Sequence, residues 1–318
     1  MVDSAINYIG EQQDNWLVHL SLLRPHPPWI APEPYNAMYS PEELQNFERQ
    51  PDIETEAKQH PLLNHYLHLP YHFVTNDDKK TARLKASYFG LMTEVDDNLG
   101  RLFEFLKKTG QWNDTLIIFT SDHGEQMGDH WLLGKMGYFD ASYRIPLIIR
   151  DPDRRADKNR DKQIDAFSEN IDIMPTLLEW LDLEIPRQCD GLSLLSIIQT
   201  GLIPENWRKA AHWEFDFRSV VSGQRLERSL GLTQDQCTLN VLRDEHYKYV
   251  HFVNLPPLFF DLKADPGEFI NQAQNPNFQS LVLEYAQKML SWRMNHDEQT
   301  LTHLALTEEG VISRNPKI

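Results

Sequence analysis

The sequence predicts an α/β fold followed by a smaller part with antiparallel strands. Strand-like and helix-like segments alternate over the first two thirds of the chain, which is typical of α/β proteins. From about residue 238 strands follow one another without helices between them, which is typical of an α+β arrangement. A chain of 318 residues can form one large domain or two smaller ones. We expect a catalytic portion at 1–230 and a C-terminal subdomain with a tail at 231–318.

The alternation in the first part is carried by four segments. Residues 16–23 predict an apolar strand that ends at a Pro-rich turn. A long amphipathic helix follows, because apolar residues recur at spacings of three and four up to Gly110. Those residues are Leu84, Tyr88, Leu91, Val95, Leu99, Leu102 and Leu106. The runs 115–120 and 145–149 are short, apolar and rich in β-branched residues, so each predicts a buried strand.

Three further stretches lie outside that alternation. Residues 40–60 are polar and acidic with several prolines, and we interpret them as an excursion or lid. A charged loop covers 151–165. Asp172 precedes an apolar stretch with Pro175 in its first turn, which predicts a helix start capped by the aspartate.

The C-terminal part has the pattern of a hairpin with an added strand and a helix. Residues 238–243 and 246–253 flank Asp244 and Glu245 and predict an antiparallel hairpin. Residues 258–262 predict a third strand, and 278–294 predict a helix before a polar tail.

Composition narrows the function classes. The chain has 31 basic and 47 acidic side chains and a net charge of −16, which argues against binding to nucleic acid or to anionic membrane surfaces. Its longest apolar runs fall short of the roughly 18 residues of a membrane helix. Two cysteines, Cys189 and Cys237, predict no disulfide framework, and neither stands in a nucleophile motif. We therefore expect a cytoplasmic protein.

The stretch Thr120–Gly124, of sequence Thr-Ser-Asp-His-Gly, is the most informative in the chain. Asp122 and His123 follow a predicted strand at its carboxyl end, where α/β sheets place their active sites. Gly124 permits a turn that would let both side chains reach one ion. The pattern predicts half of a metal site, although an isolated Asp-His-Gly also suits an ordinary turn.

Three other places could contribute to such a site. Lys135 lies in a loop with three glycines and could stabilise an anionic transition state, or be a solvated lysine. His26, between prolines, could donate a proton to a leaving oxygen, or be a surface histidine of a turn. His212, Glu214 and Asp216 alternate along one face and could form a second polar wall, but a half-exposed strand is the favoured interpretation.

Several segments together resemble the sulfatases and their relatives, the phosphonate monoester hydrolases and phosphodiesterases. The segments are 115–143, with the sequence TLIIFTSDHGEQMGDHWLLGKMGYFDASY, 23–29, 96–106, 258–268, and, for the phosphonate monoester hydrolase branch, 125–135 and 290–294. The resemblance implies an alkaline-phosphatase-like sheet sandwiched by helices, with a small C-terminal subdomain that carries an antiparallel hairpin.

The resemblance also implies roles for individual residues. Asp122 and His123 would ligate a divalent cation, either Mn²⁺, Ca²⁺ or Zn²⁺. Lys135 would contact the charged oxygens of a small anionic ester, and His26 would lie near its leaving oxygen. The cation would act as a Lewis acid and lower the pKa of the nucleophilic hydroxyl. The expected activity is metal-dependent hydrolysis of sulfate, phosphate or phosphonate esters.

The chain departs from the family pattern at the beginning. Family members start with a strand that ends in an acidic pair, followed by Cys-x-Pro-x-Arg or its serine version, whose first residue becomes the formylglycine nucleophile. This sequence has neither and resembles the C-terminal 60% or so of a member, lacking the N-terminal strands. We therefore expect a truncated form with weak Mn²⁺ binding and no turnover by itself; the alternative is a non-catalytic binding or structural partner. Residues 300–311 resemble a tail through which relatives form oligomers, so a dimer or tetramer is expected.

Overall fold

The computed structural model describes residues 1–69, 73–218, 226–296 and 304–313. The chain divides into two compact units. Unit 1 consists of Met1–Lys58 and Leu63–Arg154, and unit 2 consists of Gln59–Leu62 and Arg155–Ile318. The functional division expected at residue 230 is a different partition, and it stays a prediction.

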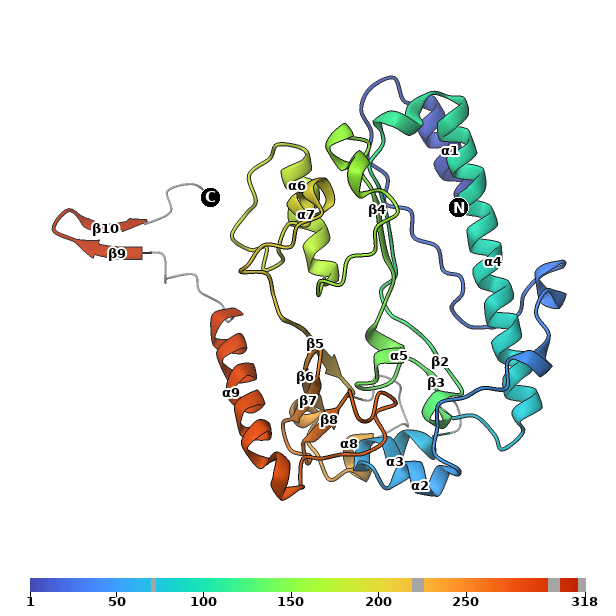
Figure 1. Ribbon diagram of the computed structural model, residues 1–318, viewed down its shortest axis with the longest axis vertical. Coiled ribbons are helices and arrows are strands. Elements are labelled where there is room, and N and C mark those ends of the chain that lie inside the picture. Colours follow the sequence, from blue (N-terminus) through green and yellow to red (C-terminus); the bar gives the residue numbers. More distant parts are fainter. Residues whose placement is uncertain (70–72, 219–225, 297–303, 314–318) are drawn as a thin grey trace. The chain divides into compact units, whose positions relative to one another are not determined.

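Unit 1 contains one long helix, several short ones and two pairs of strands (Figure 1). The helices are α1 (Val2–Glu11), α2 (Ile53–Ala57), α4 (Asp78–Lys108) and α5 (Asp140–Tyr143), while α3 (Pro61–Leu67) begins in unit 2 and continues into unit 1. The strands are β1 (Ile117–Thr120), β2 (Gln126–Met127), β3 (Leu133–Gly134) and β4 (Leu147–Arg150). The predicted long helix and the two predicted strands 115–120 and 145–149 are thereby confirmed.

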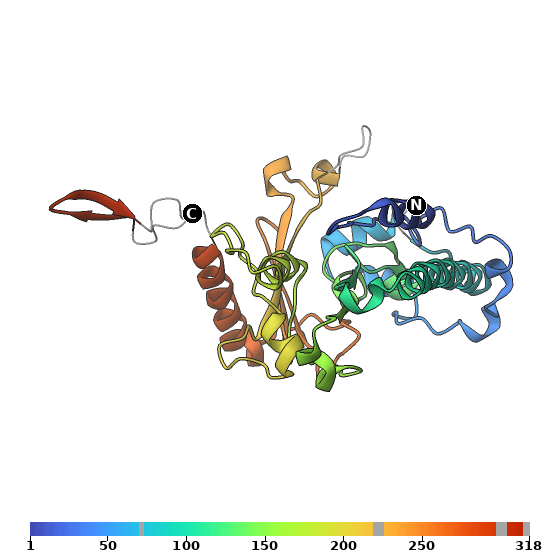
Figure 2. The ribbon, with the colours of Figure 1, turned by 90° about the horizontal axis from the view of Figure 1, so that it is seen from above.

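Helix α4 is buried along a stripe of small residues rather than along its leucines. Ala82, Ala86 and Gly90 are buried, and α1 packs on the helix nearer its C-terminal end (Figures 1 and 2). At Gly90 a β-carbon would lie only 2.3 Å from the carbonyl oxygen of Tyr35. Of the predicted apolar face only Leu91 and Leu106 are fully buried, because the neighbouring backbone approaches α4 over the small residues.

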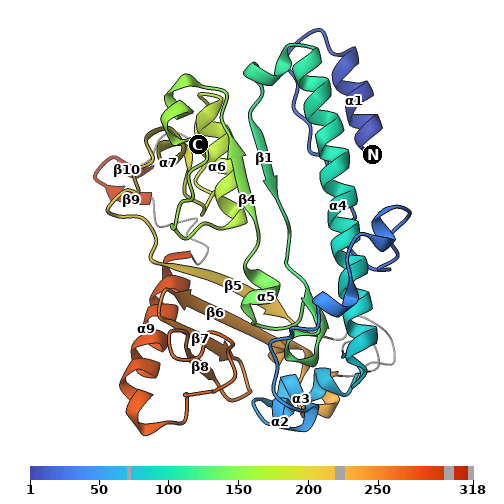
Figure 3. The same ribbon diagram turned by 45° about the vertical axis from the view of Figure 1, so that its right-hand side comes forward.

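Strands β1 and β4 form an antiparallel ribbon of two strands (Figure 3). Phe119 lies opposite Ile148, and the side chains of β1 are all half-buried. Both strands were predicted as fully buried, and that prediction is wrong: Ile148 is 64% exposed. A strand is buried on a face only where another layer covers it, and β4 has an open face here.

The prediction of a strand at residues 16–23 is also wrong. The whole segment is described, and it runs without regular structure. Leu17 and Leu23 are 67% and 70% exposed, so the apolar pattern that suggested a buried strand is not matched by burial. An extended segment becomes a strand only through ladder bonds to a neighbour. The expected lid at 40–60 contains α2 and a 3-10 turn at Pro41–Glu43.

Unit 2 is built on an antiparallel sheet in the order β5-β6-β7-β8. The strands are β5 (Ala210–Asp216), β6 (Thr238–Asp244), β7 (Tyr247–Phe252) and β8 (Leu258–Asp261). The helices are α6 (Ile173–Trp180), α7 (Leu195–Thr200), α8 (Leu226–Ser229) and α9 (Gln279–His296). The hairpin β6–β7, the third strand and the last helix agree with the prediction.

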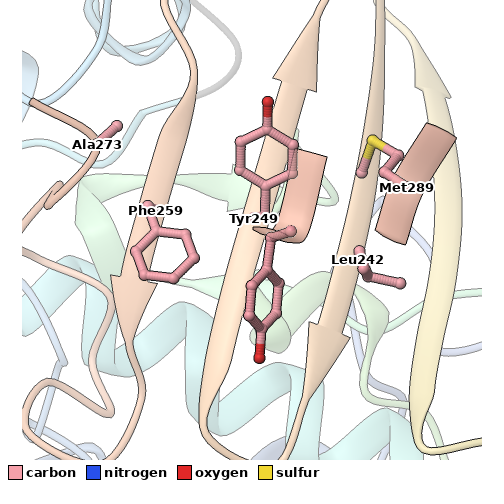
Figure 4. Close-up of a cluster of buried hydrophobic side chains, with 6 residues drawn as sticks. Leu242, Tyr249, Phe259, Ala273 and Met289 are labelled. Carbon is pink, nitrogen blue, oxygen red and sulfur yellow. The ribbon is translucent and has the colours of Figure 1, made fainter. Parts of the chain in front are cut away.

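Helix α9 packs on one face of this sheet and closes its core (Figure 4). The buried cluster draws on three strands, on the segment before α9 and on the helix: Leu242, Tyr249, Phe259, Ala273, Tyr285 and Met289. Aromatic rings meet edge to face within it, with the centroids of Phe259 and Tyr285 5.3 Å apart. Such pairs add to the free energy gained by burying their area.

The helix start at Asp172 is confirmed, but its side chain is not the cap. The Asp172 carboxylate accepts a hydrogen bond from Arg208 Nη2 at 2.6 Å and one from the backbone N–H of Leu192 at 2.8 Å. The residue is fully buried and joins two loops to the start of α6. Its Oδ2 also accepts from the backbone N–H of Glu169 at 2.8 Å, in the capping box of the 3-10 turn Asn170–Asp172 that precedes α6.

The C-terminal residues that are described form a hairpin of β9 (Leu304–Thr307) and β10 (Gly310–Ser313). Residues 300–303 of the tail lie outside the described residues, and self-association through this tail stays a prediction. Among the helices of the described ranges, none combines the length and the apolar character needed to cross a membrane.

Candidate active site

The candidate site begins where β1 ends. Thr120 Oγ1 donates a hydrogen bond to the carbonyl oxygen of Pro146 at 3.0 Å, and Ser121 Oγ donates to that of His123 at 2.6 Å. The backbone N–H of His123 donates to Asp122 Oδ1 at 3.1 Å. The local bonds of the Ser121 and Asp122 side chains fold the chain into a tight turn directly after the strand, and the Thr120 bond ties that turn to the segment before β4.

Gly124 allows this turn to pack closely on α5. Its N–H donates to the carbonyl oxygen of Ser142 at 2.8 Å, and a β-carbon at this position would lie 2.1 Å from the carbonyl oxygen of Ala141. Gly124 is not one of the glycines with positive φ. The glycine is therefore needed for the approach of two backbone segments, and not for a left-handed conformation.

His123 and Lys135 are brought into direct contact. His123 Nδ1 lies 2.7 Å from the carbonyl oxygen of Gly124, which can only accept, so Nδ1 carries the proton and Nε2 has the lone pair. Lys135 Nζ lies 2.5 Å from Nε2 and donates to it. The imidazole side chain is 19% exposed. An ammonium cation thus stands at the atom that the sequence predicts as a metal ligand.

Asp122 lies next to the same nitrogen. Its Oδ2 is 3.6 Å from His123 Nε2, and its side chain is 86% exposed. Two ligand atoms at about 2.1 Å from one ion are separated by at most about 4.2 Å, so both atoms can reach a single cation. The bond from His123 Nδ1 to a backbone carbonyl is the usual support of a ligating histidine.

Asp122 and His123 fit part of a cation site. Mixed carboxylate and imidazole donors suit Mn²⁺ or Zn²⁺ at least as well as Ca²⁺. Over the ranges that the structure describes, no three His, Cys, Asp or Glu side chains converge on one point. The roles of these two residues as ligands stay a prediction.

Glu125 is a site residue that sequence reasoning missed. Burial raises the pKa of its carboxyl group to about 7, while the charges of Lys135 and His26 act in the opposite direction. Its Oε1 is buried and has no hydrogen-bond partner among the described residues. Its position two residues after His123, at the start of the hairpin β2–β3, was the available signal.

His26 therefore belongs to the same neighbourhood, because its charge acts on Glu125. The histidine is exposed, and its Nδ1 lies 2.8 Å from the carbonyl oxygen of Pro27. That contact leaves Nε2 as the nitrogen that can exchange a proton with a ligand. The structure brings His123 and Lys135 into contact, and the charges of Lys135 and His26 both act on the pKa of Glu125.

Other candidates are occupied elsewhere. His212 stacks on Trp292 with centroids 3.3 Å apart, and Glu214 accepts from Arg293 at 2.5 Å, so these residues of β5 bind α9 in unit 2. The favoured interpretation of a half-exposed strand is confirmed. Both cysteines are free thiols, and burial raises the pKa of Cys237, which makes it a poor nucleophile.

Residues 1–183 match the family described as Sulfatase, and residues 128–295 match the family described as N-sulphoglucosamine sulphohydrolase, C-terminal. The chain belongs to the sulfatase family, since the first match covers more than half of it.

Three relatives illustrate where the chain stands among known proteins. It is 50% identical over 98% of its length to the "Multifunctional alkaline phosphatase superfamily protein PehA" of Trinickia caryophylli, and covers 62% of that protein. The phosphonate monoester hydrolase of Agrobacterium radiobacter has a similar structure, with a TM-score of 0.91 and 44% identity over 99% of this chain. The phosphonate monoester hydrolase SpPMH from Silicibacter pomeroyi follows with a TM-score of 0.86 and 34% identity over 98% of this chain.

The likeness to these structures confirms the predicted alkaline-phosphatase-like α/β fold class. The chain spans less than two thirds of each relative, 64% of the Agrobacterium radiobacter protein and 63% of the Silicibacter pomeroyi protein. Members of this family are metal-dependent hydrolases of sulfate or phosphonate esters.

Proposed function

We propose that this chain contributes ester-binding and metal-binding residues to a hydrolase of phosphonate or phosphate monoesters and diesters. The observation that carries the proposal is the contact of Lys135 Nζ with His123 Nε2 at the end of β1, 2.5 Å long. Two relatives whose names specify phosphonate monoester hydrolase share this fold at 34% and 44% identity. Sulfate esters are the second candidate, because the "Arylsulfatase" of Clostridium perfringens is 27% identical over 95% of this chain.

Local charge supports an anionic substrate in spite of the net charge of −16. The charges of Lys135 and His26 both act on the pKa of Glu125, so both side chains lie within electrostatic reach of one carboxyl group. An oxyanion bound there would accept hydrogen bonds from the Lys135 ammonium. Donors fixed before the reaction stabilise the charge that develops on a transferring phosphoryl group.

Each residue has a defined task in this proposal. Lys135 would orient the ester by binding a non-bridging oxygen. His26 would give a proton to the leaving oxygen through Nε2. Asp122 and His123 would hold the divalent cation, which supplies Lewis-acid polarisation when it is bound. His123 Nε2 would then give its single lone pair to the cation, and Lys135 Nζ would leave it for the ester oxygen. Glu125, on whose pKa both charges act, would counter them while no substrate is present.

Mn²⁺ binding by the purified chain tests the metal assignment. We expect electron paramagnetic resonance to show weak binding that is lowered at least about tenfold by His123→Ala, because a ligand is removed. Glu179→Ala, on α6 in unit 2, is the control and should leave the binding unchanged. Equal binding by wild type and His123→Ala would contradict the assignment.

The ester assignment is tested with phenylphosphonate as the probe. We expect its binding, followed by nuclear magnetic resonance titration, to be weakened about tenfold or more in Lys135→Met, since the side chain keeps its length and loses its charge. If sulfate binds and phenylphosphonate does not, the sulfatase alternative is correct. If the binding of neither anion depends on Lys135, the ester-binding role of Lys135 is contradicted.

A further inference from the structure

The hairpin that joins His123 to Lys135 is too short to hold its own orientation. Strands β2 and β3 have two residues each, paired as Gln126 with Gly134 and Met127 with Leu133. An isolated two-stranded hairpin is marginal in water even when it is longer. The position of Lys135, which directly follows β3, must therefore be fixed by contacts that the rest of unit 1 makes with the hairpin.

The tip of this hairpin is bound to the segment 47–57 by hydrogen bonds and a cation–π contact. The backbone N–H of His130 donates to the carbonyl oxygen of Glu48 at 2.8 Å, and that of Glu48 donates to Asp129 Oδ1 at 2.9 Å. Trp131 Nε1 donates to the carbonyl oxygen of Gln50 at 2.9 Å, and the Arg49 guanidinium lies 3.7 Å from a Trp131 ring centroid. The segment predicted as a lid is thus bound to the hairpin.

A buried pair, Glu56 and His130, lies among these contacts between the hairpin tip and the segment 47–57. Glu56 Oε1 lies 2.9 Å from His130 Nδ1, and Glu56 Oε2 accepts from the backbone N–H of Gln50 at 2.7 Å. Glu56 and His130 are 1% and 4% exposed. Both carboxylate oxygens are used, so the carboxylate ties α2, the chain before it and the hairpin tip together.

The tip has a backbone conformation that needs such support. His130 and Trp131 have φ angles of 53° and 59°, in the left-handed region that residues with a β-carbon avoid. Two consecutive residues of this kind persist only where the surroundings hold them. Substitutions that release the tip therefore allow the hairpin to relax.

His130 also connects the tip to the His123 side of the site. Its ring stacks on that of Phe139 with centroids 3.7 Å apart. Phe139 is the residue directly before α5, and the Ala141 and Ser142 carbonyls of α5 lie against Gly124. One imidazole is therefore linked through β3 to Lys135 and through α5 to the turn that carries His123.

We infer that Glu56 and His130 are positioning residues for Lys135. The buried pair holds the hairpin tip in place, so that Lys135 Nζ lies at His123 Nε2 and within reach of the oxyanion of a bound ester. The inference rests on the proposed function for the part that concerns the ester. The contact between Lys135 and His123 is independent of it.

The contact is measured by the ¹⁵N chemical shift of His123 Nε2 in the full chain. Lys135→Met gives the shift without the ammonium donor. We expect Glu56→Ala and His130→Leu to move the signal most of the way to that value, and Glu56→Gln to move it less, because an amide oxygen can still accept from His130. Glu54→Gln, on the exposed side of the same helix, is the control. An unchanged signal in Glu56→Ala and His130→Leu, with the rest of the spectrum folded, would overturn the inference.

A double-mutant cycle with phenylphosphonate tests the second part. If Glu56 acts through Lys135, Glu56→Ala weakens binding about tenfold in the wild-type background and has almost no effect in Lys135→Met. Equal effects in both backgrounds would show a purely structural role and contradict the inference. If the wild type binds no phenylphosphonate, the proposed function fails, and the ¹⁵N measurement alone decides whether the pair positions Lys135.

Discussion

Each of the two units contains a buried carboxylate paired with a basic side chain, and the two pairs have different surroundings. In unit 2 the side chains of Lys248 and Glu268 form an ion pair and are 0% and 4% exposed. In unit 1 Glu56 and His130 are paired with similar burial. In both pairs one partner has a left-handed backbone, with φ of 58° at Glu268 and 53° at His130.

The difference lies in what each pair supports. Lys248 belongs to the central part of a four-stranded sheet whose core is closed by α9, so its pair adds to an element that is already well packed. His130 belongs to a hairpin with two residues per strand, which has no core of its own. The same kind of interaction therefore stabilises a domain in one unit and orients a functional side chain in the other.

Breaking the pair in unit 2 should have the largest effect on stability. Lys248→Met leaves the Glu268 carboxylate buried without its partner, which costs about 3–5 kcal/mol of the free energy of unfolding. Urea denaturation followed by circular dichroism measures this loss. The double variant Lys248→Met/Glu268→Leu should recover most of it, since no charge then remains buried. Equal losses in both variants would show that the lost stability comes from the packing of these side chains and not from an unpaired buried charge.

Acid should weaken unit 2 through His60. Its Nδ1 accepts from the N–H of Leu62 at 3.2 Å, its Nε2 lies 2.9 Å from the carbonyl oxygen of Pro256, and burial lowers its pKa from 6.5 to about 4. Between these two values the unfolded chain binds the proton and the folded chain does not. Stability therefore falls as the pH drops from about 6.5 to 4, by about 3 kcal/mol in total, and is flat above.

Unfolding free energies measured from pH 7.5 to 4 check this dependence. His60→Gln should remove that part of the slope, because glutamine does not titrate. A slope that is identical in wild type and His60→Gln would assign the effect to other groups.

Gly124→Ala should have an intermediate effect that is concentrated at the site. The added methyl group would overlap the Ala141 carbonyl, so the turn or α5 must move, at a cost of about 1–3 kcal/mol. The ¹⁵N signal of His123 should shift together with the loss of stability. Gly100→Ala, where a β-carbon meets nothing within 4 Å, is the matched control in unit 1 and should not destabilise the chain.

The smallest effect is expected at an exposed ion pair of unit 2. Lys288 Nζ lies 2.7 Å from Glu284 Oε1 one turn apart on α9, and both side chains are about half exposed. Lys288→Ala should change the free energy of unfolding by no more than about 0.5 kcal/mol, and addition of salt should reduce this further. A loss of several kcal/mol would show that charge by itself, without burial, stabilises this helix.

Local patterns in the sequence predicted the elements of unit 2 well. The hairpin β6–β7 and strand β8 are close in sequence, are rich in apolar and aromatic residues, and pair with their chain neighbours. The strands of unit 1 were harder to predict, because the burial of a strand depends on which other elements pack against its faces. Residues 16–23 have the composition of a strand and no pairing, and Ile148 is apolar and exposed.

The site was predictable in part. The turn of Asp122 and His123 and the return of Lys135 to it followed from sequence order and resemblance. Glu125 was missed because its character comes from burial, and Glu56 because 74 residues separate it from His130. A buried contact between distant segments leaves no periodicity in either of them.

Gly90 has a consequence for the geometry around His26. The Tyr35 carbonyl fits against α4 at this glycine, where a β-carbon would lie 2.3 Å from its oxygen. The contact therefore sets the register of the segment 31–37 along the helix. Sliding by one helical turn would displace that segment by about 5.4 Å. His26 is only five residues before it, so the contact at Gly90 also constrains where His26 lies on the surface of unit 1.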